Sequence, residues 1–337
     1  MPFVDTTVIY SHPGTVPLDK NLPVLPKRDP SRVAQTGFSP PNFAHVTELV
    51  RYMKDQVLHE LIDKYATTIE RPLPGKPHLI SPNEKVCTNT HRGFWEHVSD
   101  LSGLAITAAF EWKFANRITA FGIFQRIPTN KRQQAIWFAK HATQFEAWVS
   151  GYESRLLQMG KQQWNRFDWL VGYLDRAVDR IAMEVAEEGV TKFQDLQFES
   201  RLAFKVTFPG PGPPNPATIL RGRPDIVFDP GDGKQATIWE IKLVKALKSE
   251  HIAQLMLYGL LWAAKQPDAP FPRLLLFNVR DGARLEVVTT LEKTRGFVEE
   301  LLRAKYTVTK RIDDTEFWRL CEKTMDEARF VVDRIPQ

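Results

Sequence analysis

The sequence predicts an α/β (α+β) fold, with a central mixed sheet flanked by helices and a helical region before it. In residues 46–190 the apolar residues follow a helical pattern, whereas from residue 193 they alternate at every second position. The order of elements after that point is strand, strand, strand, helix, strand, strand. Since 43% of the 337 residues are hydrophobic and 25% are charged, the chain has enough apolar material for a large core.

The N-terminal half is expected to form an extended arm followed by helices. Eight of the 24 prolines lie in residues 1–45, which lack apolar periodicity, and proline has no N–H for a helix or a central strand. Residues 46–190 are interpreted as a helical region that packs on the core. The predicted helices cover residues 43–66, 92–115, 131–158 and 163–188, with a loop over 71–85 and a helix end at Gly189.

The C-terminal part, residues 191–337, is expected to form the core of the fold. Three strands in a meander are predicted, because apolar residues alternate and turn residues separate the runs: residues 193–206, 219–228 and 236–244. A helix then begins at Ser249, a good capping residue, and ends at residue 265. The remaining elements are strands over 273–279 and 284–290 and helices over about 291–305 and 314–333.

Composition narrows the class of protein. Two cysteines, Cys87 and Cys321, are too few for a disulfide scaffold, a four-cysteine zinc site or a four-cysteine iron–sulfur cluster. No stretch approaches the roughly 20 apolar residues of a membrane helix, so no membrane partner is expected. The first residues lack the basic and apolar segments of a secretory signal. We therefore expect a protein of a reducing intracellular compartment, the cytoplasm or the nucleus.

The charge distribution suggests a nucleic-acid partner without establishing one. A net charge of +5 is mildly basic and decides little by itself. Residues 115–170 say more, because they hold eight Lys or Arg, three Asp or Glu and four of the nine tryptophans. Such a stretch is compatible with binding to phosphates and stacking on bases. A pair of amphipathic helices with tryptophan in their core explains the same pattern and is the simpler interpretation.

Polar residues with related chemistry fall in a short interval of the predicted core. Alternation places Glu240 and Lys242 on one face of their strand, with apolar residues on the other. Gln254 and Tyr258 are four residues apart, so they share one face of the next helix. The full set is Glu199 in the first strand, Asp225 of the segment GRPD in the second, Glu240 and Lys242 of WEIK in the third, and Gln254 and Tyr258 on the helix.

Carboxylates that converge from neighbouring strands repel one another unless a cation lies between them. Hard oxygen ligands of this kind favour Mg²⁺ or Mn²⁺. Lys242 follows the last carboxylate, and its ammonium could orient a water, help its deprotonation or offset phosphate charge. A solvated strand face would explain Glu240 and Lys242 without any function. We disfavour it because residues 236–244 are hydrophobic enough for a central strand, where exposed charge pairs are rare.

The segments GRPD, WEIK and QLMLY resemble the RecB-type branch of the PD-(D/E)xK nuclease superfamily, over about residues 193–290. The resemblance implies a restriction-endonuclease-like core and a metal-dependent nuclease that hydrolyses DNA phosphodiester bonds, as an exonuclease or an endonuclease. In the family, the residues that match Asp225 and Glu240 bind the metal, and the one that matches Lys242 is catalytic. Glu199 is the natural match for an earlier acidic residue that often completes the metal ligands.

The resemblance also gives roles to the helix that follows the third strand. It implies that Gln254 and Tyr258 contact the DNA backbone near the scissile phosphate. Some relatives carry a further histidine on an upstream helix, for which His97 and His141 are the available matches. Both are more readily explained as packed or surface histidines, and neither is assigned as a ligand.

Two alternatives stay open. One is a catalytically inactive nucleic-acid-binding or scaffold protein on a nuclease fold, against which the intact Asp, Glu and Lys set argues. The other is an RNA endonuclease of the same superfamily. The pattern of Gln254 and Tyr258 favours DNA over RNA. The sequence offers no residue that is identified as recognising the 2′-hydroxyl of RNA.

Overall fold

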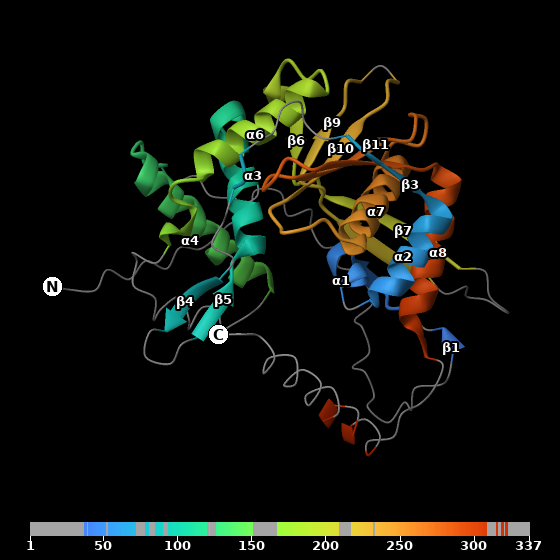
Figure 1. Cartoon of the computed structure of the whole chain (residues 1–337). Coiled ribbons are helices and arrows are strands. Elements are labelled where there is room, and N and C mark those ends of the chain that lie inside the picture. The colour runs from blue at the N-terminus through green and yellow to red at the C-terminus, as the bar shows by residue number, and fades with distance from the viewer. Residues whose placement is uncertain are drawn as a thin grey trace, which may run out of the picture. The chain divides into compact units, whose positions relative to one another are not determined.

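The most apolar predicted strand, residues 236–244, lies inside a six-stranded sheet (Figure 1). Five of the six residues of β10 (Thr237–Lys242) are buried, as expected for a central strand. It runs parallel to β11 (Arg273–Asn278) and antiparallel to β9 (Ile226–Phe228), which makes the sheet mixed, as predicted. The other strands are β12 (Arg284–Val288) and β3 (Thr67–Glu70) beyond β11, and β6 (Leu196–Phe198) beyond β9.

This computed structural model describes only part of the chain. Contacts divide it into two units, residues 42–302 and a second unit of residues 1–41 with 303–337. The predicted strand-rich core up to residue 302 and the region before it, from residue 46, therefore lie in one unit. The described residues are 37–38, 40–51, 53–71, 78–80, 85–89, 94–119, 121, 126–150, 167–208, 217–231, 233–308, 315, 318–319 and 321–322.

A smaller sheet has three strands in the order β2, β8, β7. Strand β2 (Phe43–His45) runs parallel to β8 (Ala217–Gly222), and β7 (Leu202–Thr207) runs antiparallel to β8. Two-stranded pairs complete the described strands: β4 (Lys85–Asn89) with β5 (Phe94–His97), and β1 (Gly37–Phe38) with β13 (Thr307–Val308).

Two predicted strands are each divided between the two sheets, so their prediction as single strands is wrong. Residues 193–206 form a 3₁₀ turn followed by β6 and β7, and residues 219–228 lie in β8 and β9. The breaks lie side by side, because Phe198 pairs with Ile226 on one side and Leu202 with Gly222 on the other. Glu199 has a left-handed φ of 48°, which bends the chain from one sheet into the other.

Helices cover both faces of the six-stranded sheet (Figure 1). On one face α3 (Ser99–Ala115), α4 (Lys131–Ser150) and α6 (Leu174–Glu187) share a hydrophobic core with β10 and β11. On the other face α7 (Ser249–Lys265) contacts β10, β11, β7 and β8. Helices α1 (Val46–Val50) and α2 (Asp55–Tyr65) pack against α7. The alternation predicted for β10 is confirmed, since Trp239, Ile241 and Leu243 belong to the core shared with α3, α4 and α6.

The N-terminal half differs most from expectation. The predicted helix over 43–66 begins instead as β2, and its helical part is interrupted because Arg51 and Lys54 have extended backbone. This break lets α1 and α2 each pack against α7. The predicted helix over 92–115 starts only at Ser99, after β5, and the one over 163–188 starts at Leu174, after a 3₁₀ turn over Asp168–Leu170.

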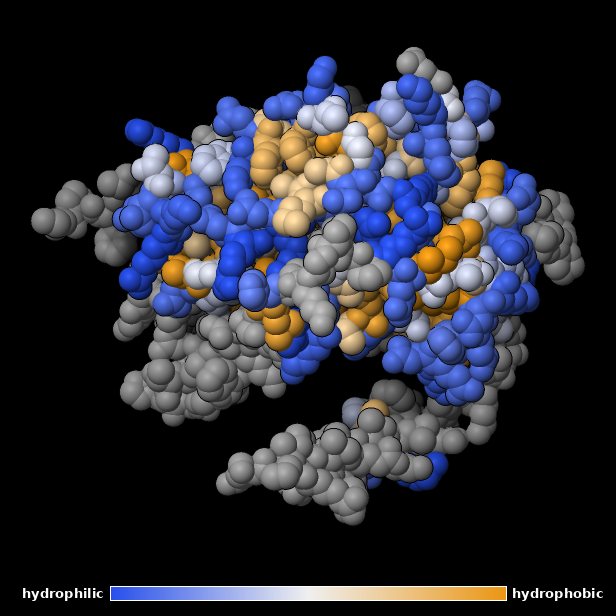
Figure 2. Space-filling model, turned by 45° about the horizontal axis from the view of Figure 1, so that its top comes forward, coloured by the Kyte–Doolittle hydropathy of each residue, from blue (hydrophilic) through white to orange (hydrophobic). Residues whose placement is uncertain are grey.

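Other elements match. The helix 249–265, the strands that became β11 and β12, and α8 (Leu291–Tyr306) are confirmed, as is the helix end near Gly189, whose φ is 80°. Most of the arm (residues 1–36), residues 151–158 and most of the predicted helix over 314–333 lie outside the described residues. Within the described part, no helix is long and apolar enough to cross a membrane. The face shown in Figure 2 is mostly hydrophilic, with hydrophobic side chains in separate patches.

Candidate active site

Three carboxylates occupy one row across neighbouring strands. Residues Phe198, Ile226 and Trp239 are paired across β6, β9 and β10. The next position of the same register holds Glu199, Asp225 and Glu240, and the Glu199 N–H donates to the Asp225 carbonyl at 3.3 Å. Residues directly opposite one another in antiparallel strands share a face, which places Asp225 and Glu240 together. Glu199, where the chain bends out of the sheet, is close enough to both for their charges to raise its pKa, so the three acidic residues that the sequence singled out lie near one another.

Glu240 is the most enclosed of the three, with 2% of its surface exposed. Its Oε1 accepts a hydrogen bond from Lys242 Nζ at 2.6 Å, whereas its buried Oε2 has no hydrogen-bond partner among the described residues. Burial, and next the charge of Asp225, raise the pKa of Glu240 to about 8. A buried carboxylate oxygen without a partner is costly, so this atom is suited to a ligand that the structure does not contain.

Asp225 and Glu199 are half-buried. Asp225 Oδ2 accepts a hydrogen bond from the Ile241 N–H at 2.6 Å, which fixes the carboxylate against β10. Burial raises the pKa of Asp225, and the charge of Lys242 opposes that rise. Burial and the charge of Asp225 raise the pKa of Glu199 well above its ordinary value, while Arg223 opposes the rise. The row thus brings three carboxyl groups into a poorly solvated place, where burial and mutual repulsion disfavour their charged forms.

The fit of a metal ion to this row can be judged from its atoms. No three His, Cys, Asp or Glu side chains of the described residues are already arranged to hold a metal. In the row, Asp225 and Glu240 each direct one oxygen to a protein donor, Ile241 N and Lys242 Nζ. The unpartnered Oε2 of Glu240 and the mutual repulsion of the three carboxylates nevertheless suit a hard divalent cation. The donor set therefore fits Mg²⁺ or Mn²⁺ after rearrangement of side chains.

A chain of polar contacts leads from the row into α7. Lys242 Nζ donates to Glu240 Oε1 and, at 3.3 Å, to Gln254 Oε1. Gln254 Nε2 then donates to the Tyr258 hydroxyl at 2.9 Å. Both α7 residues are buried, with 7% and 3% of their surfaces exposed, and burial raises the pKa of Tyr258. The helical face predicted for them is confirmed, and it points toward Lys242.

Gly222 explains why the GRPD segment and Tyr258 occur together. A Cβ at residue 222 would lie 2.6 Å from Tyr258 Cε1 and 2.8 Å from Val46 Cγ2. Only glycine leaves room for the ring at this point of β8. The two segments are therefore complementary surfaces of one packing contact, in addition to carrying polar side chains to the same region.

Sequence reasoning missed a buried acid next to the row. Glu111 of α3 is 1% exposed and accepts hydrogen bonds from Arg117 Nε at 3.1 Å and from the Thr119 N–H at 2.6 Å. Arg117 Nη2 also donates to the Leu196 carbonyl at 2.7 Å, which ties the end of α3 to β6. The charge of Glu111 adds to the rise in the pKa of Glu199. No spacing rule connects residues 111 and 199, so nothing in the sequence indicated this neighbour.

The histidines take structural places. His141 is buried in α4, where its Nδ1 lies 2.7 Å from the Trp137 carbonyl and its ring stacks on Trp137. His97 belongs to β5, whose side chains lie outside the described part. A third, His251 at the start of α7, accepts at Nδ1 from the Lys248 N–H at 3.0 Å. Burial and the charge of Lys242 lower the pKa of His251 to about 3, so it is neutral at ordinary pH.

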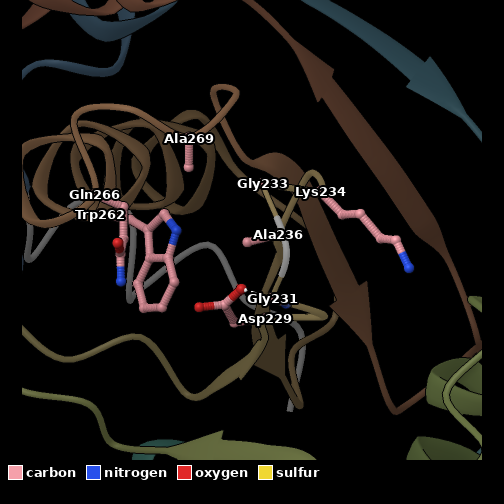
Figure 3. Close-up of a pocket in the computed structure, with 8 residues that line it drawn as sticks. All are labelled: Asp229, Gly231, Gly233, Lys234, Ala236, Trp262, Gln266 and Ala269. Carbon is pink, nitrogen blue, oxygen red and sulfur yellow. Dashed lines mark hydrogen bonds between the residues drawn. The ribbon is translucent and has the colours of Figure 1, made fainter.

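A small pocket of about 260 Å³ lies away from the row (Figure 3). Its wall includes Ala236, just before β10, whereas Glu240 and Lys242 lie toward the other end of that strand. The buried Nε1 of Trp262, which also lines it, has no hydrogen-bond partner among the described residues. The lining residues are Asp229, Gly231, Gly233, Lys234, Ala236, Trp262, Gln266 and Ala269.

No known family model, curated protein or solved structure matches this chain. What the site does must therefore follow from its own chemistry.

Proposed function

We propose that this protein is a metal-dependent nuclease that hydrolyses DNA phosphodiester bonds, on a restriction-endonuclease-like core of the RecB type. The row of Glu199, Asp225 and Glu240 carries the proposal, because burial and mutual repulsion raise the pKa values of its carboxyl groups, and a bound divalent cation would relieve that repulsion. A protein that only binds nucleic acid gains nothing from this costly arrangement. The cofactor is Mg²⁺ or Mn²⁺, with these three residues as ligands.

The residues around the row divide the work. A bound Mg²⁺ or Mn²⁺ supplies countercharge to the phosphate and lowers the pKa of a water. Glu240 and Asp225 would hold the cation through carboxylate oxygens that are not taken up by their hydrogen bonds to Lys242 and to the backbone of β10, such as the unpartnered Oε2 of Glu240. Lys242 lies beside these carboxylates, where its ammonium orients the attacking water or neutralises the negative charge that develops on the phosphate.

Gln254 and Tyr258 act first as positioning residues. Gln254 holds Lys242 Nζ, and Tyr258 holds Gln254, so the pair fixes the ammonium relative to Glu240. Their burial supports this role. Direct contact of either side chain with the DNA backbone stays a prediction, because it requires α7 or the neighbouring side chains to open.

Cleavage of end-labelled linear and circular DNA, with Mg²⁺, with Mn²⁺ and with a chelator, tests the proposal. We expect cutting only with a metal, and its loss in Asp225→Asn, Glu240→Gln and Lys242→Ala. Glu292→Gln and Lys293→Ala, at exposed positions of α8, are the matched charge controls and should cut normally.

Each outcome of this assay is informative. Normal cutting by Lys242→Ala means that the site assignment is wrong. Binding of DNA without cutting under any condition favours the inactive-scaffold alternative. Faster cutting of an RNA strand than of the matching DNA strand favours the RNA endonuclease.

A further inference from the structure

The outer face of the three-stranded sheet β2-β8-β7 is exposed beside the row. Its inner face is covered, since Ala44, Leu202 and Leu220 are buried and α7 packs against β7 and β8. The alternate residues point outward, and those at exposed positions are Phe43, His45, Ala203, Lys205, Thr207 and Arg221. We call these six residues the outer face.

The outer face combines an aromatic ring with positive charge. Phe43 is 47% exposed, so its ring is accessible to a ligand. The Arg221 guanidinium lies 5.2 Å from the centre of the Phe43 ring, and Lys205 lies on β7, the other neighbour of β8. The strands β2, β7 and β8 contain no Asp or Glu. A ring flanked by cations, without carboxylates, is complementary to a polyanion that carries flat rings.

The outer face is continuous with the carboxylate row. Strand β7 begins three residues after Glu199, and β8 ends three residues before Asp225. Arg221 and Asp225 are four residues apart, so the extended backbone between them spans about 14 Å at about 3.4 Å per residue. Arg223, between them, is close enough to influence the pKa of Glu199. A ligand lying along β8 would therefore extend toward the three carboxylates.

We propose that the outer face binds a single strand of DNA and directs it to the carboxylate row, with an unpaired base on Phe43 and phosphates on Lys205 and Arg221. The part of this inference in which the bound strand leads to the carboxylate row rests on the proposed nuclease function. The ligand is a single strand, because a ring on a sheet surface stacks on a base only when that base is not paired inside a duplex.

Binding of a labelled single strand, followed by fluorescence anisotropy in chelator, tests the aromatic part. We expect single-stranded DNA to bind more tightly than a duplex of the same length. Phe43→Ala should bind about tenfold more weakly, a typical effect of losing one stacking ring. Phe43→Trp should bind as the wild type does, and Ile69→Ala, at an exposed residue of β3, is the matched control. Melting temperatures identify any variant that does not fold.

The salt dependence separates the roles of the side chains. Lys205→Ala and Arg221→Ala should each lower the slope of log affinity against log salt by about 0.7, the value for one lost phosphate contact on a single strand. Phe43→Ala should weaken binding without changing that slope. Lys293→Ala, on α8, should change neither quantity. Wild-type affinity and slope in all three outer-face variants would overturn the proposal, as would tighter binding of the duplex.

Measuring both binding and cleavage distinguishes a failure of the outer-face proposal from a failure of the proposed nuclease function. A protein that cuts DNA, but whose Phe43→Ala variant binds and cuts a single strand normally, has the nuclease site without this surface. A protein that never cuts, but loses single-strand binding in Phe43→Ala, has the surface without the nuclease. A matching RNA strand is the remaining arm, and binding of RNA alone contradicts the assignment to DNA.

Discussion

Gly222 lies directly against the ring of Tyr258, where no other residue would fit without movement of the ring. The added Cβ of an alanine would be 2.6 Å from Tyr258 Cε1, and the ring is buried between β8 and the body of α7. Two segments 36 residues apart in the sequence therefore depend on each other. The contact sets the distance between α7 and β8. It thereby also positions Gln254 for its hydrogen bond with Lys242.

Gly222→Ala should destabilise the protein by about 1–3 kcal/mol, because the buried ring and Val46 must shift to admit the methyl group. Gly103→Ala in α3 is the matched control, since an added Cβ there meets nothing within 4 Å. Replacing a glycine inside a helix should leave stability unchanged or raise it by up to about 1 kcal/mol. Urea unfolding measures both, and equal midpoints for the two variants would contradict the packing argument.

Mg²⁺ or Mn²⁺ should raise the melting temperature of the protein. A ligand that binds only the folded state stabilises it by about 2.7 kcal/mol at a hundredfold excess over its dissociation constant. Asp225→Asn should lose most of this shift and should raise the melting temperature without metal, because it removes one of the repelling carboxylates. Thermal unfolding with and without millimolar Mn²⁺ measures both effects. An unchanged melting temperature of the wild type would argue against the metal site.

Tyr258→Phe and Gln254→Ala should separate positioning from metal binding. Both leave Glu199, Asp225 and Glu240 intact, so calorimetric titration should give near-normal Mn²⁺ affinity. Single-turnover cleavage should be at least roughly tenfold slower, about 1.4 kcal/mol of lost transition-state stabilisation, because Lys242 loses its fixed position. Tyr258→Phe keeps the ring against Gly222 and should therefore fold. Normal cleavage by both variants would mean that Gln254 and Tyr258 contribute only to packing.

His251 should make the protein sensitive to acid. Its pKa is about 3 when folded and about 6.5 when unfolded, so the unfolded state binds the additional proton between these values. The free energy of unfolding therefore falls as pH falls from about 6.5 toward 3, by on the order of 4 kcal/mol from this group. Glu250 Oε1, 3.5 Å from Nε2, is on an exposed side chain and offsets little of this.

The variant His251→Asn should lose less stability over this range, because it has no group to protonate. His59→Asn, which changes a histidine with an exposed side chain on α2, should behave like the wild type. Urea unfolding at several pH values checks the difference between the variants. Identical pH dependence of His251→Asn and the wild type would mean that the buried imidazole does not control it.

The sequence determined the part of the fold where local pattern and burial agree. Strand β10, helix α7 and the elements from β11 to α8 follow the predicted boundaries closely, because each is a continuous run with buried apolar residues and ends near a change in the sequence pattern. The sequence also selected the residues of the row. Acidic side chains inside hydrophobic strands conflict with burial, and that conflict is visible without a structure.

Only the tertiary structure decided how the strands divide and what the row contacts. Apolar alternation continues from Phe198 to Leu202 and Phe204, so periodicity could not reveal that the chain leaves one sheet for another. The edge strands β2 and β3 pair with strands more than 170 residues away, and no local signal encodes such pairing. Likewise, the contact of Gly222 with Tyr258 and the burial of Glu111 depend on distances through space. The periodicity of apolar residues indicates which face of a segment is buried. Which elements cover that face is decided only by tertiary packing.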